Sequence, residues 1–371
     1  MDIKEEAYEE AIRVLERCST KNGFYAAYPG YDMVFARDSM IISLGASLID
    51  DKFKKVIESS LTTLGNYQSK KGQIPNAVDK FSKREGHVDY KSIDSTLWWV
   101  IGNYLFKERY GGDYMIRNNK DKIKKAVEWL SYQDMGEDGL LEQQPTTDWQ
   151  DALPHRYGHT INTQALWYKV LSLIGDKGKA SKVKEVVNNS KDDGLWNGKF
   201  YDSYRWKNHN KYKEVSDWFD SLGNFLAILY GLSDNFQSNN ILDYVRKNKI
   251  NRPYPVKAIY PPISQKSKYW QDYFLDAGAT ENKYLNGGIW TFIGGFYVCA
   301  LVKRGRLKEA EKELNLLAEA NLLAPKYSEW MDGLSGRPGQ AGSGSKEGNQ
   351  GWNAGMFVVA YESVKRKKCL I

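Results

Sequence analysis

The sequence predicts an all-α fold, an (α/α)6 toroid built from six helical hairpins. The main observation is a segment that occurs six times: a polar or glycine-containing stretch, followed by an apolar helix rich in aromatic and small residues. The six copies span residues 36–49, 93–106, 158–174, 216–232, 286–302 and 349–364. Their starts are 57, 65, 58, 70 and 63 residues apart, close to the length of two helices with a long and a short connection.

More charged stretches with one apolar face lie between these segments. Clear examples span residues 50–68, 121–133, 180–189 and 306–320. Helices of this kind bury one face and leave the other in solvent, whereas the recurring segments are apolar on nearly all sides and have to be buried. We therefore expect six inner helices surrounded by six outer helices, forming one domain over residues 1–371 with a basic tail at 365–371.

Cysteine usage and the N-terminal sequence favour a cytoplasmic location. Cys18, Cys299 and Cys369 are an odd number of cysteines without metal-ligand spacing, so neither a disulfide framework nor a zinc site is expected. The N-terminal stretch is acidic and helix-forming, and it lacks the basic start and apolar core of a signal peptide. No apolar run approaches the length of a membrane span, so we expect no membrane association.

The net charge of +7, from 53 Lys and Arg against 46 Asp and Glu, does not indicate a nucleic-acid partner. Four of the basic residues form one run from Lys365 to Lys368, and the rest of the chain has neither a basic stripe nor a recognition motif. Cys369 is third from the end, one position short of a prenylation motif. A solvated tail is the expectation.

The polar stretches before the inner helices should meet at one rim of the toroid, and they concentrate carboxylates, amides and indoles. These rim residues are Arg37, Asp38, Asp94, Asp148, Trp149, Asp151, His155, Arg156, Asp217, Trp218, Asp220, Asn286, Trp290, Glu329, Trp330, Asp332, Gln350 and Trp352. Pyranose rings present C–H faces to aromatic rings and hydroxyl groups to carboxylates. A carbohydrate ligand is therefore expected at this rim, although core packing also explains much of the aromatic content.

Four segments resemble the six-hairpin glycosidases, a superfamily that includes amylo-α-1,6-glucosidase domains of glycogen-debranching enzymes, neutral and alkaline invertases and, more distantly, trehalases. They are ARDSM from residue 36, SIDSTLWW from 92, TDWQDALPHRYGHTINTQALWY from 147, and NGGIW from 286 with EWMDGLSGRPG and NQGWNAG in the C-terminal third. None is diagnostic alone, but all four occur in the family order. The resemblance extends from about Tyr28 to Tyr361 and implies an inverting glycoside hydrolase.

The resemblance implies that Asp151 is the general acid and Glu329 the general base. Inversion needs one protonated carboxyl beside the leaving oxygen and a second carboxylate that activates water, so no metal or other cofactor is expected. Apolar neighbours of Asp151 should raise its pKa, and Arg156 would oppose this if it pointed inward. The alternatives are a loop aspartate bonded to local backbone for Asp151 and a surface residue for Glu329.

Further residues in the matching segments and at the rim are predicted to contact the sugar: Arg37, Asp38, Asp94, Trp98, Trp149, Arg156, Gln164, Trp218, Asp220, Asn286, Trp290, Trp330, Asp332 and Trp352. Asp94 also fits a helix N-cap, and it is the second candidate for the general acid. For Arg37 and Asp38 the alternative is an ion pair at a helix start.

Two other features are weaker. The glycine-rich stretch 332–351 is expected to form a mobile lid near the base. His155 and His159 have the spacing of a helical metal pair, but Pro154 favours a loop and no partnering carboxylate motif follows, so no metal site is predicted.

The substrate stays open at this point. The favoured function is hydrolysis of an α-glucosidic linkage in an oligosaccharide or a glycogen-type substrate, and a sucrose invertase or a trehalase-like enzyme is the alternative. A different class is also possible, either a sugar epimerase or a non-catalytic sugar-binding toroid. Epimerases of this architecture use paired histidines, and the chain has only His87, His155, His159 and His209.

Overall fold

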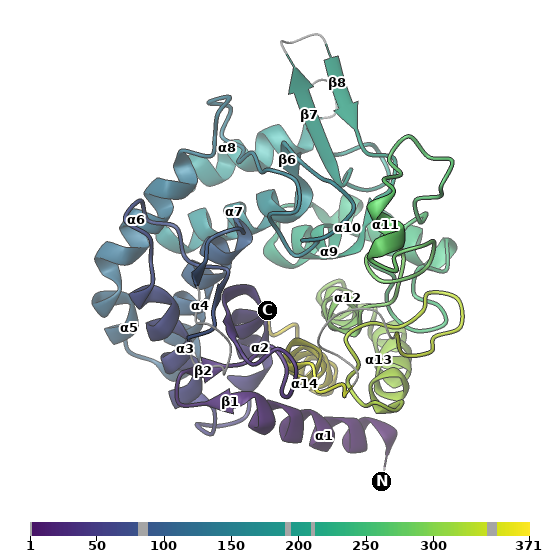
Figure 1. The fold of residues 1–371 in the computed structure, drawn as a ribbon, viewed down its shortest axis with the longest axis horizontal. Coiled ribbons are helices and arrows are strands. Elements are labelled where there is room, and N and C mark those ends of the chain that lie inside the picture. The colour runs from purple at the N-terminus through teal and green to yellow at the C-terminus, as the bar shows by residue number, and fades with distance from the viewer. Residues whose placement is uncertain (1, 81–87, 190–193, 209–211, 340–346) are drawn as a thin grey trace.

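The computed structural model describes residues 2–80, 88–189, 194–208, 212–339 and 347–371, and in these ranges the chain forms a toroid of helices (Figure 1). Six described helices make the inner ring: α2 (Ala36–Ala46), α4 (Asp94–Tyr110), α7 (Ile161–Ile174), α9 (Ser221–Tyr230), α12 (Thr291–Lys303) and α14 (Gly351–Lys365). Each packs against the next in chain order, and α14 packs against α2, so the ring is closed. The six predicted inner helices are confirmed.

Six other helices surround the ring in the described residues: α1 (Ile3–Cys18), α3 (Lys54–Asn66), α6 (Lys120–Ser131), α8 (Lys177–Asn188), α10 (Asn235–Lys247) and α13 (Leu307–Leu322). Two short helices, α5 (Tyr114–Asn118) and α11 (Tyr273–Asp276), lie in connections. All of α2 is buried, whereas the outer helices bury one face each. The amphipathic pattern identified four of the outer helices but did not single out α10.

The polar stretches directly before α2, α7 and α9 form short strands, and further short strands lie in other connections. The strands are β1 (Ser19–Thr20), β2 (Gly23–Phe24), β3 (Val34–Phe35), β4 (Ala77–Val78), β5 (Val88–Asp89), β6 (His159–Thr160), β7 (Tyr204–Asn208), β8 (Tyr212–Val215), β9 (Phe219–Asp220) and β10 (Ile259–Tyr260). All pairs are antiparallel, in the orders β1-β2, β3-β4-β5, β6-β7-β8 and β10-β9. The β7–β8 hairpin projects beyond the ring (Figure 1).

Strand pairing just before an inner helix fixes the residue at which that helix begins. In β9, for example, Asp220 pairs with Ile259 and its carboxylate accepts a hydrogen bond from the Gly223 amide, so α9 begins at Ser221, after the stretch 216–220 that opens the predicted segment. We call the polar stretches before the inner helices their lips. Pairing with neighbouring segments holds these lips, and the side chains on them, in fixed positions.

The C-terminal tail differs in part from the expected solvated tail. Lys365 to Lys368 are exposed, but the last three residues are half-buried and turn back toward the axis of the ring. Leu370 and Ile371 line a small pocket together with Leu44 and Tyr230, near the C-terminal ends of α2 and α9, and the Arg109 guanidinium donates to the Leu370 carbonyl. These last residues are apolar, and packing there removes them from water.

No described helix combines the length and the apolar character that a membrane span requires.

The ring closes where α2 and α14 cross through glycines. A Cβ atom on Gly45 would overlap the carbonyl oxygen of Gly355, and a Cβ on Gly355 would lie 2.8 Å from the backbone of Ile42. The two helix backbones therefore approach more closely than any larger residue would permit.

We predict that Gly45→Ala destabilises the protein by about 1–3 kcal/mol, because an added methyl group has no room at this crossing. The free energy of unfolding from urea titrations measures the effect. Gly178→Ala is the matched control: Gly178 lies on the exposed first turn of α8 with open space around it, so the change should leave stability equal or slightly higher. Equal stability of Gly45→Ala and wild type would contradict the described crossing.

Candidate active site

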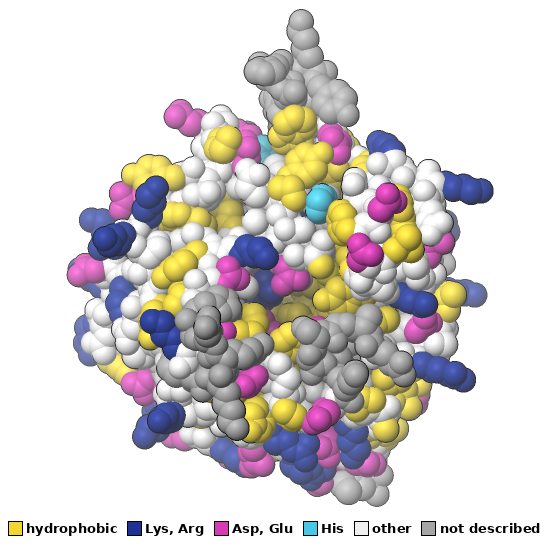
Figure 2. Space-filling view, viewed as in Figure 1, with side chains coloured by type: hydrophobic (Ala, Val, Ile, Leu, Met, Phe, Trp, Pro, Cys, Tyr) yellow, Lys and Arg dark blue, Asp and Glu magenta, His cyan; other side chains and the backbone are white. Residues whose placement is uncertain are grey.

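A pocket of about 270 Å³ lies where the lips of the inner helices meet. Its lining residues are Ala26, Tyr31, Phe35, Arg37, Asp38, Trp149, Asp151, Tyr284, Leu285, Trp290, Glu329, Gln350 and Trp352. Figure 2 shows a recess near the centre of this face, with hydrophobic side chains inside it and acidic and basic side chains at its edge. The predicted general acid and general base, which are far apart in the sequence, both line this pocket.

Indole rings form one wall of the pocket. Trp149 and Trp352 each meet Trp290 edge to face, with ring centroids 5.8 and 5.9 Å apart, and Trp352 stacks on Phe292 at 4.1 Å. These contacts hold the rings in fixed orientations. The resulting apolar wall suits the C–H face of a sugar ring.

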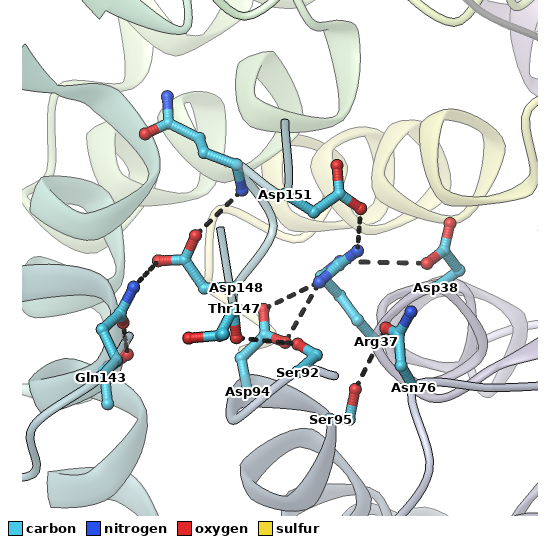
Figure 3. A network of polar contacts seen from close by, with 12 residues as sticks. Arg37, Asp38, Asn76, Ser92, Asp94, Ser95, Gln143, Thr147, Asp148 and Asp151 are labelled. Atoms are coloured by element: carbon cyan, nitrogen blue, oxygen red, sulfur yellow. Dashed lines mark hydrogen bonds and ion pairs between the residues drawn. The ribbon is translucent and has the colours of Figure 1, made fainter. Parts of the chain in front are cut away.

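Charged groups form the floor (Figure 3). Arg37, in the first turn of α2, points its guanidinium at three carboxylates. Nη1 lies 3.1 and 3.2 Å from the two carboxylate oxygens of Asp94, Nη2 lies 3.5 Å from Asp151, and Nε lies 3.9 Å from Asp38. One cation is therefore shared by three acidic side chains.

The surroundings of Asp151 favour its protonated form. Enclosure by the walls of the pocket raises the pKa of Asp151, Arg37 opposes the rise, and the negative charges of Asp94 and Asp148 add to it. The side chain still keeps 47% of its surface accessible, because it faces the open pocket. The cation that opposes the rise is Arg37 and not, as the sequence suggested, Arg156.

Asp38 responds to the same surroundings. Burial raises its pKa to about 6, with Arg37 opposing the rise and Asp151 adding to it.

Glu329 lies in the connection between α13 and α14 and is buried, with 5% of its surface exposed. The Tyr31 hydroxyl donates a hydrogen bond to Glu329 Oε1 at 3.2 Å. Burial raises the pKa of Tyr284 well above its ordinary value, and the charges of Glu329 and Asp151 raise it further, which places this phenol close to both carboxyls. No sequence pattern pointed to Tyr31 or Tyr284, because each is a single tyrosine outside a recognisable motif.

Asp94 does not line the pocket. Helix α4 begins at Asp94, and Ile93 occupies the N-cap position without a side-chain cap, so the predicted capping role is wrong. Instead the Asp94 carboxylate is fully buried against Arg37 and accepts a hydrogen bond from the Ser92 hydroxyl. Direct contact of Asp94 with a ligand in this pocket is therefore not supported by its position.

Arg156 and Asp220 form a second buried charge cluster beside the pocket. The Arg156 guanidinium pairs with Asp148 and with Asp220, and all three side chains are almost completely buried. Asp148 also accepts hydrogen bonds from the side chain of Gln143 and from the backbone amide of Gln150. This cluster holds the loop that leads to Asp151, so Arg156 and Asp220 act in the structure as supports and do not line the pocket.

The remaining predicted sugar contacts are engaged elsewhere. Trp98 packs against Phe296 between inner helices. Gln164 exchanges hydrogen bonds with the backbone of Leu141.

Four more of these residues do not line the pocket and have protein partners, although the partner of Trp330, Tyr284, is itself part of the pocket lining. Trp218 packs on Tyr204 and Tyr269, Asn286 bonds to the backbone of Ile263 and Ala279, Trp330 packs on Tyr284, and Asp332 accepts from the amides of Leu334 and Ser335. The sequence analysis correctly placed these four residues in the connections that precede the inner helices. It could not distinguish side chains that line the pocket from side chains that pack within the protein.

Neither of the two described histidines, His155 and His159, lines the pocket. His155 stacks on Tyr273 with centroids 5.0 Å apart, and His159 lies in β6 with Nε2 3.7 Å from Asp138 and 3.8 Å from Glu142. The two are therefore not a helical pair. His87 and His209 lie outside the described residues, as does part of the predicted lid, residues 340–346.

Comparisons with known proteins give a matching family and several relatives of similar sequence. The family model described as amylo-alpha-1,6-glucosidase matches residues 10–334. Probable alkaline/neutral invertase D of Arabidopsis thaliana is 37% identical over 123 residues, which cover 32% of this chain and 22% of that protein. Probable alkaline/neutral invertase A, chloroplastic, from the same plant is 24% identical over 306 residues, or 66% of this chain and 47% of that protein. The chain thus spans less than half the length of these relatives.

Solved structures share the fold. The GH63 mannosylglycerate hydrolase of Thermus thermophilus in complex with glucose has a TM-score of 0.69 at 15% identity, over 95% of this chain and 99% of that chain. A bacterial glucoamylase complexed with acarbose has a TM-score of 0.67 at 14% identity, over 98% of this chain and 56% of that chain. The predicted resemblance to six-hairpin glycosidases is confirmed.

We predict that Asp38→Asn stabilises the protein at pH 8 and much less at pH 4. Because the pKa of Asp38 in the folded state, about 6, is above its ordinary 3.8, the folded state loses stability as pH rises from about 4 to 6. Removing the ionisable group should recover on the order of 2–3 kcal/mol at pH 8. Chemical denaturation at both pH values measures this.

Asp332→Asn is the control with the opposite sign. Backbone and side-chain hydrogen bonds lower the pKa of Asp332, so its ionised form stabilises the folded state above the ordinary pKa. This variant should lose stability at pH 8. A parallel response of the two variants would contradict the assigned surroundings of Asp38.

Proposed function

Because the chain belongs to the amylo-alpha-1,6-glucosidase family of glycoside hydrolases, we propose that it hydrolyses an α-glucosidic bond of an oligosaccharide or a small glycoside, with Asp151 as general acid and Glu329 as general base. One observation carries the proposal. Asp151 and Glu329, from separate segments, line one pocket with an indole wall, and this pocket has the groups that glycoside hydrolysis requires.

The two carboxyls have surroundings that suit different roles. The raised pKa of Asp151 favours a protonated carboxyl that can donate to the leaving oxygen. Glu329, held at Oε1 by the Tyr31 hydroxyl, would accept a proton from a water molecule on the opposite face of the sugar. Direct displacement by this water inverts the anomeric configuration.

The size of the pocket favours a small substrate or a chain end. Small-molecule sites commonly measure about 300–1,000 Å³, and this pocket of about 270 Å³ is near the lower limit. We infer that the pocket takes the terminal glucosyl unit, while the rest of the substrate extends past the rim. This is compatible with removal of a single branch glucose as well as with cleavage of a disaccharide.

Sucrose hydrolysis is the second candidate. It is favoured by the matches to alkaline/neutral invertases, one of which extends over 66% of this chain. An epimerase is not proposed, because no histidine is among the described residues that line the pocket.

We predict that Asp151→Asn and Glu329→Gln each lower the hydrolysis rate by about a hundredfold to ten-thousandfold, since a general acid or base typically contributes a factor of that size. Glucose release from sucrose, trehalose, isomaltose, panose, glycogen limit dextrin and glucosylglycerate identifies the substrate for this comparison. Glu142→Gln, a carboxyl outside the pocket, is the matched control and should keep nearly full activity.

Proton NMR of the first product distinguishes the stereochemical outcomes. Initial release of the anomer with retained configuration would contradict inversion. Unchanged hydrolysis by either variant would remove that residue from catalysis. Sugar binding by the wild type without turnover of any substrate would favour the non-catalytic alternative.

A further inference from the structure

The three nitrogen atoms of one guanidinium face three different aspartates at the floor of the pocket (Figure 3). Nη1 of Arg37 contacts both oxygens of Asp94, Nη2 contacts one oxygen of Asp151, and Nε faces Asp38. Arg37 is 3% exposed and Asp94 is completely buried, so solvent does little to screen these charges. One positive charge cannot compensate three ionised carboxylates in such a place.

The contacts show which aspartate is paired most closely with the Arg37 guanidinium. Asp94 has the shortest distances to Arg37, 3.1 and 3.2 Å, and also receives the Ser92 hydroxyl hydrogen bond. Asp151 has one long contact of 3.5 Å and faces the open pocket. Hydrogen bonds and short ion pairs favour the ionised form. Burial raises the pKa of Asp94, but the Arg37 ion pair and the Ser92 hydrogen bond both oppose that rise. Because these contacts are closer than those of Asp151, we place the negative charge on Asp94 and the proton on the carboxyl that faces the pocket.

We propose that Asp94 is a positioning residue that engages Arg37 on the side away from the pocket and thereby keeps the Asp151 carboxyl protonated for donation to the leaving oxygen. The inference rests on the proposed function, since it assigns a partner to the general acid named there. Asp94 itself does not touch the substrate. Its effect reaches Asp151 through the shared guanidinium and through its own negative charge.

The segment around Asp94 also fixes the loop that holds Asp151. The Ile93 amide donates to the Thr147 carbonyl at 2.7 Å, and the Ser92 hydroxyl, which donates to Asp94, lies 3.0 Å from the same carbonyl oxygen. The same short stretch at the start of α4 therefore supplies the negative charge of Asp94 and fixes the position of the loop that holds Asp151.

The other charged and titratable groups that act on Asp151 come from several elements. Arg37 and Asp38 belong to α2, Asp148 lies on the same loop as Asp151, and Tyr284 lies in the connection before α12. Among these, Arg37 lowers the pKa of Asp151, whereas Asp148 and Asp94 raise it. Removing the charge of Asp94 therefore weakens one effect that favours the proton and frees Arg37 to strengthen the effect that opposes it.

The test is the pH profile of kcat/KM for Asp94→Asn, measured on the glycoside that the wild type hydrolyses. We predict that the alkaline limb, which reports loss of the proton from the general acid, moves to lower pH by about one unit or more. Activity at pH 8 should then fall about tenfold or more relative to activity at the acidic optimum. An unmoved limb, or one that moves to higher pH, would overturn the inference, even if overall activity were low.

Asp220→Asn is the matched control. Asp220 is also a completely buried aspartate at the start of an inner helix and is also paired with an arginine, but it is not among the groups that act on Asp151. This variant should lose stability without moving the alkaline limb. An equal shift in both variants would mean that the limb responds to general loosening of the site, and the role of Asp94 would be refuted.

Ser92→Ala keeps the inference testable if Asp94→Asn does not fold. Loss of the hydroxyl removes a hydrogen bond that favours the ionised Asp94 carboxylate, so a smaller shift in the same direction is expected, and an unmoved limb would count against the proposal. Asp151→Asn distinguishes a failure of the proposed general acid from a failure of the role proposed for Asp94. If that variant is active, the assignment of the acid fails; if it is inactive while the limb is unmoved in Asp94→Asn, only the role of Asp94 fails.

Discussion

Each inner helix has protein on every side, and this constraint determines where polar chemistry can lie in the toroid. Along the helices the side chains have to be apolar or paired within the protein, as the complete burial of α2 illustrates. At the lips the chain leaves the helix, and short strands brace it instead. Polar side chains can therefore converge at the lips without disturbing the packing beneath them.

Two arginines make this convergence possible. Arg37 compensates Asp94 at the pocket floor, and Arg156 compensates Asp148 and Asp220 beside it. A buried carboxylate without such a partner would be strongly destabilising. The loop that holds Asp151 runs between the two clusters, because Asp148 belongs to one cluster and Asp151 contacts the other. The position of the proposed acid thus depends on two buried ion-pair clusters rather than on the loop alone.

Burial on all sides is also the reason why the six inner helices could be predicted from the sequence: it leaves long apolar segments at regular spacing. Asp151 and Glu329 were identified through family motifs, and the structure brings both to one pocket. The position of a residue just before an inner helix does not show which way its side chain points. Trp218 and Asn286 were predicted to contact the sugar, but both are packed within the protein. Tyr31 and Tyr284 were missed, because tertiary contacts alone bring them to the carboxyls.

The floor of the pocket has fewer cations than carboxyls, and this shortage is itself a chemical property of the site. Full compensation of Asp38 and Asp151 would lower their pKa values and leave no protonated group near neutral pH. Burial raises the pKa of Asp38 to about 6 and that of Asp151 above its ordinary value, and the shared Arg37 opposes these rises only in part, at a cost in stability. The apolar packing of the helical ring stabilises the fold and offsets the stability that is lost at these carboxyls. The acid role proposed for Asp151 therefore depends on three buried or enclosed carboxyls that share a single arginine.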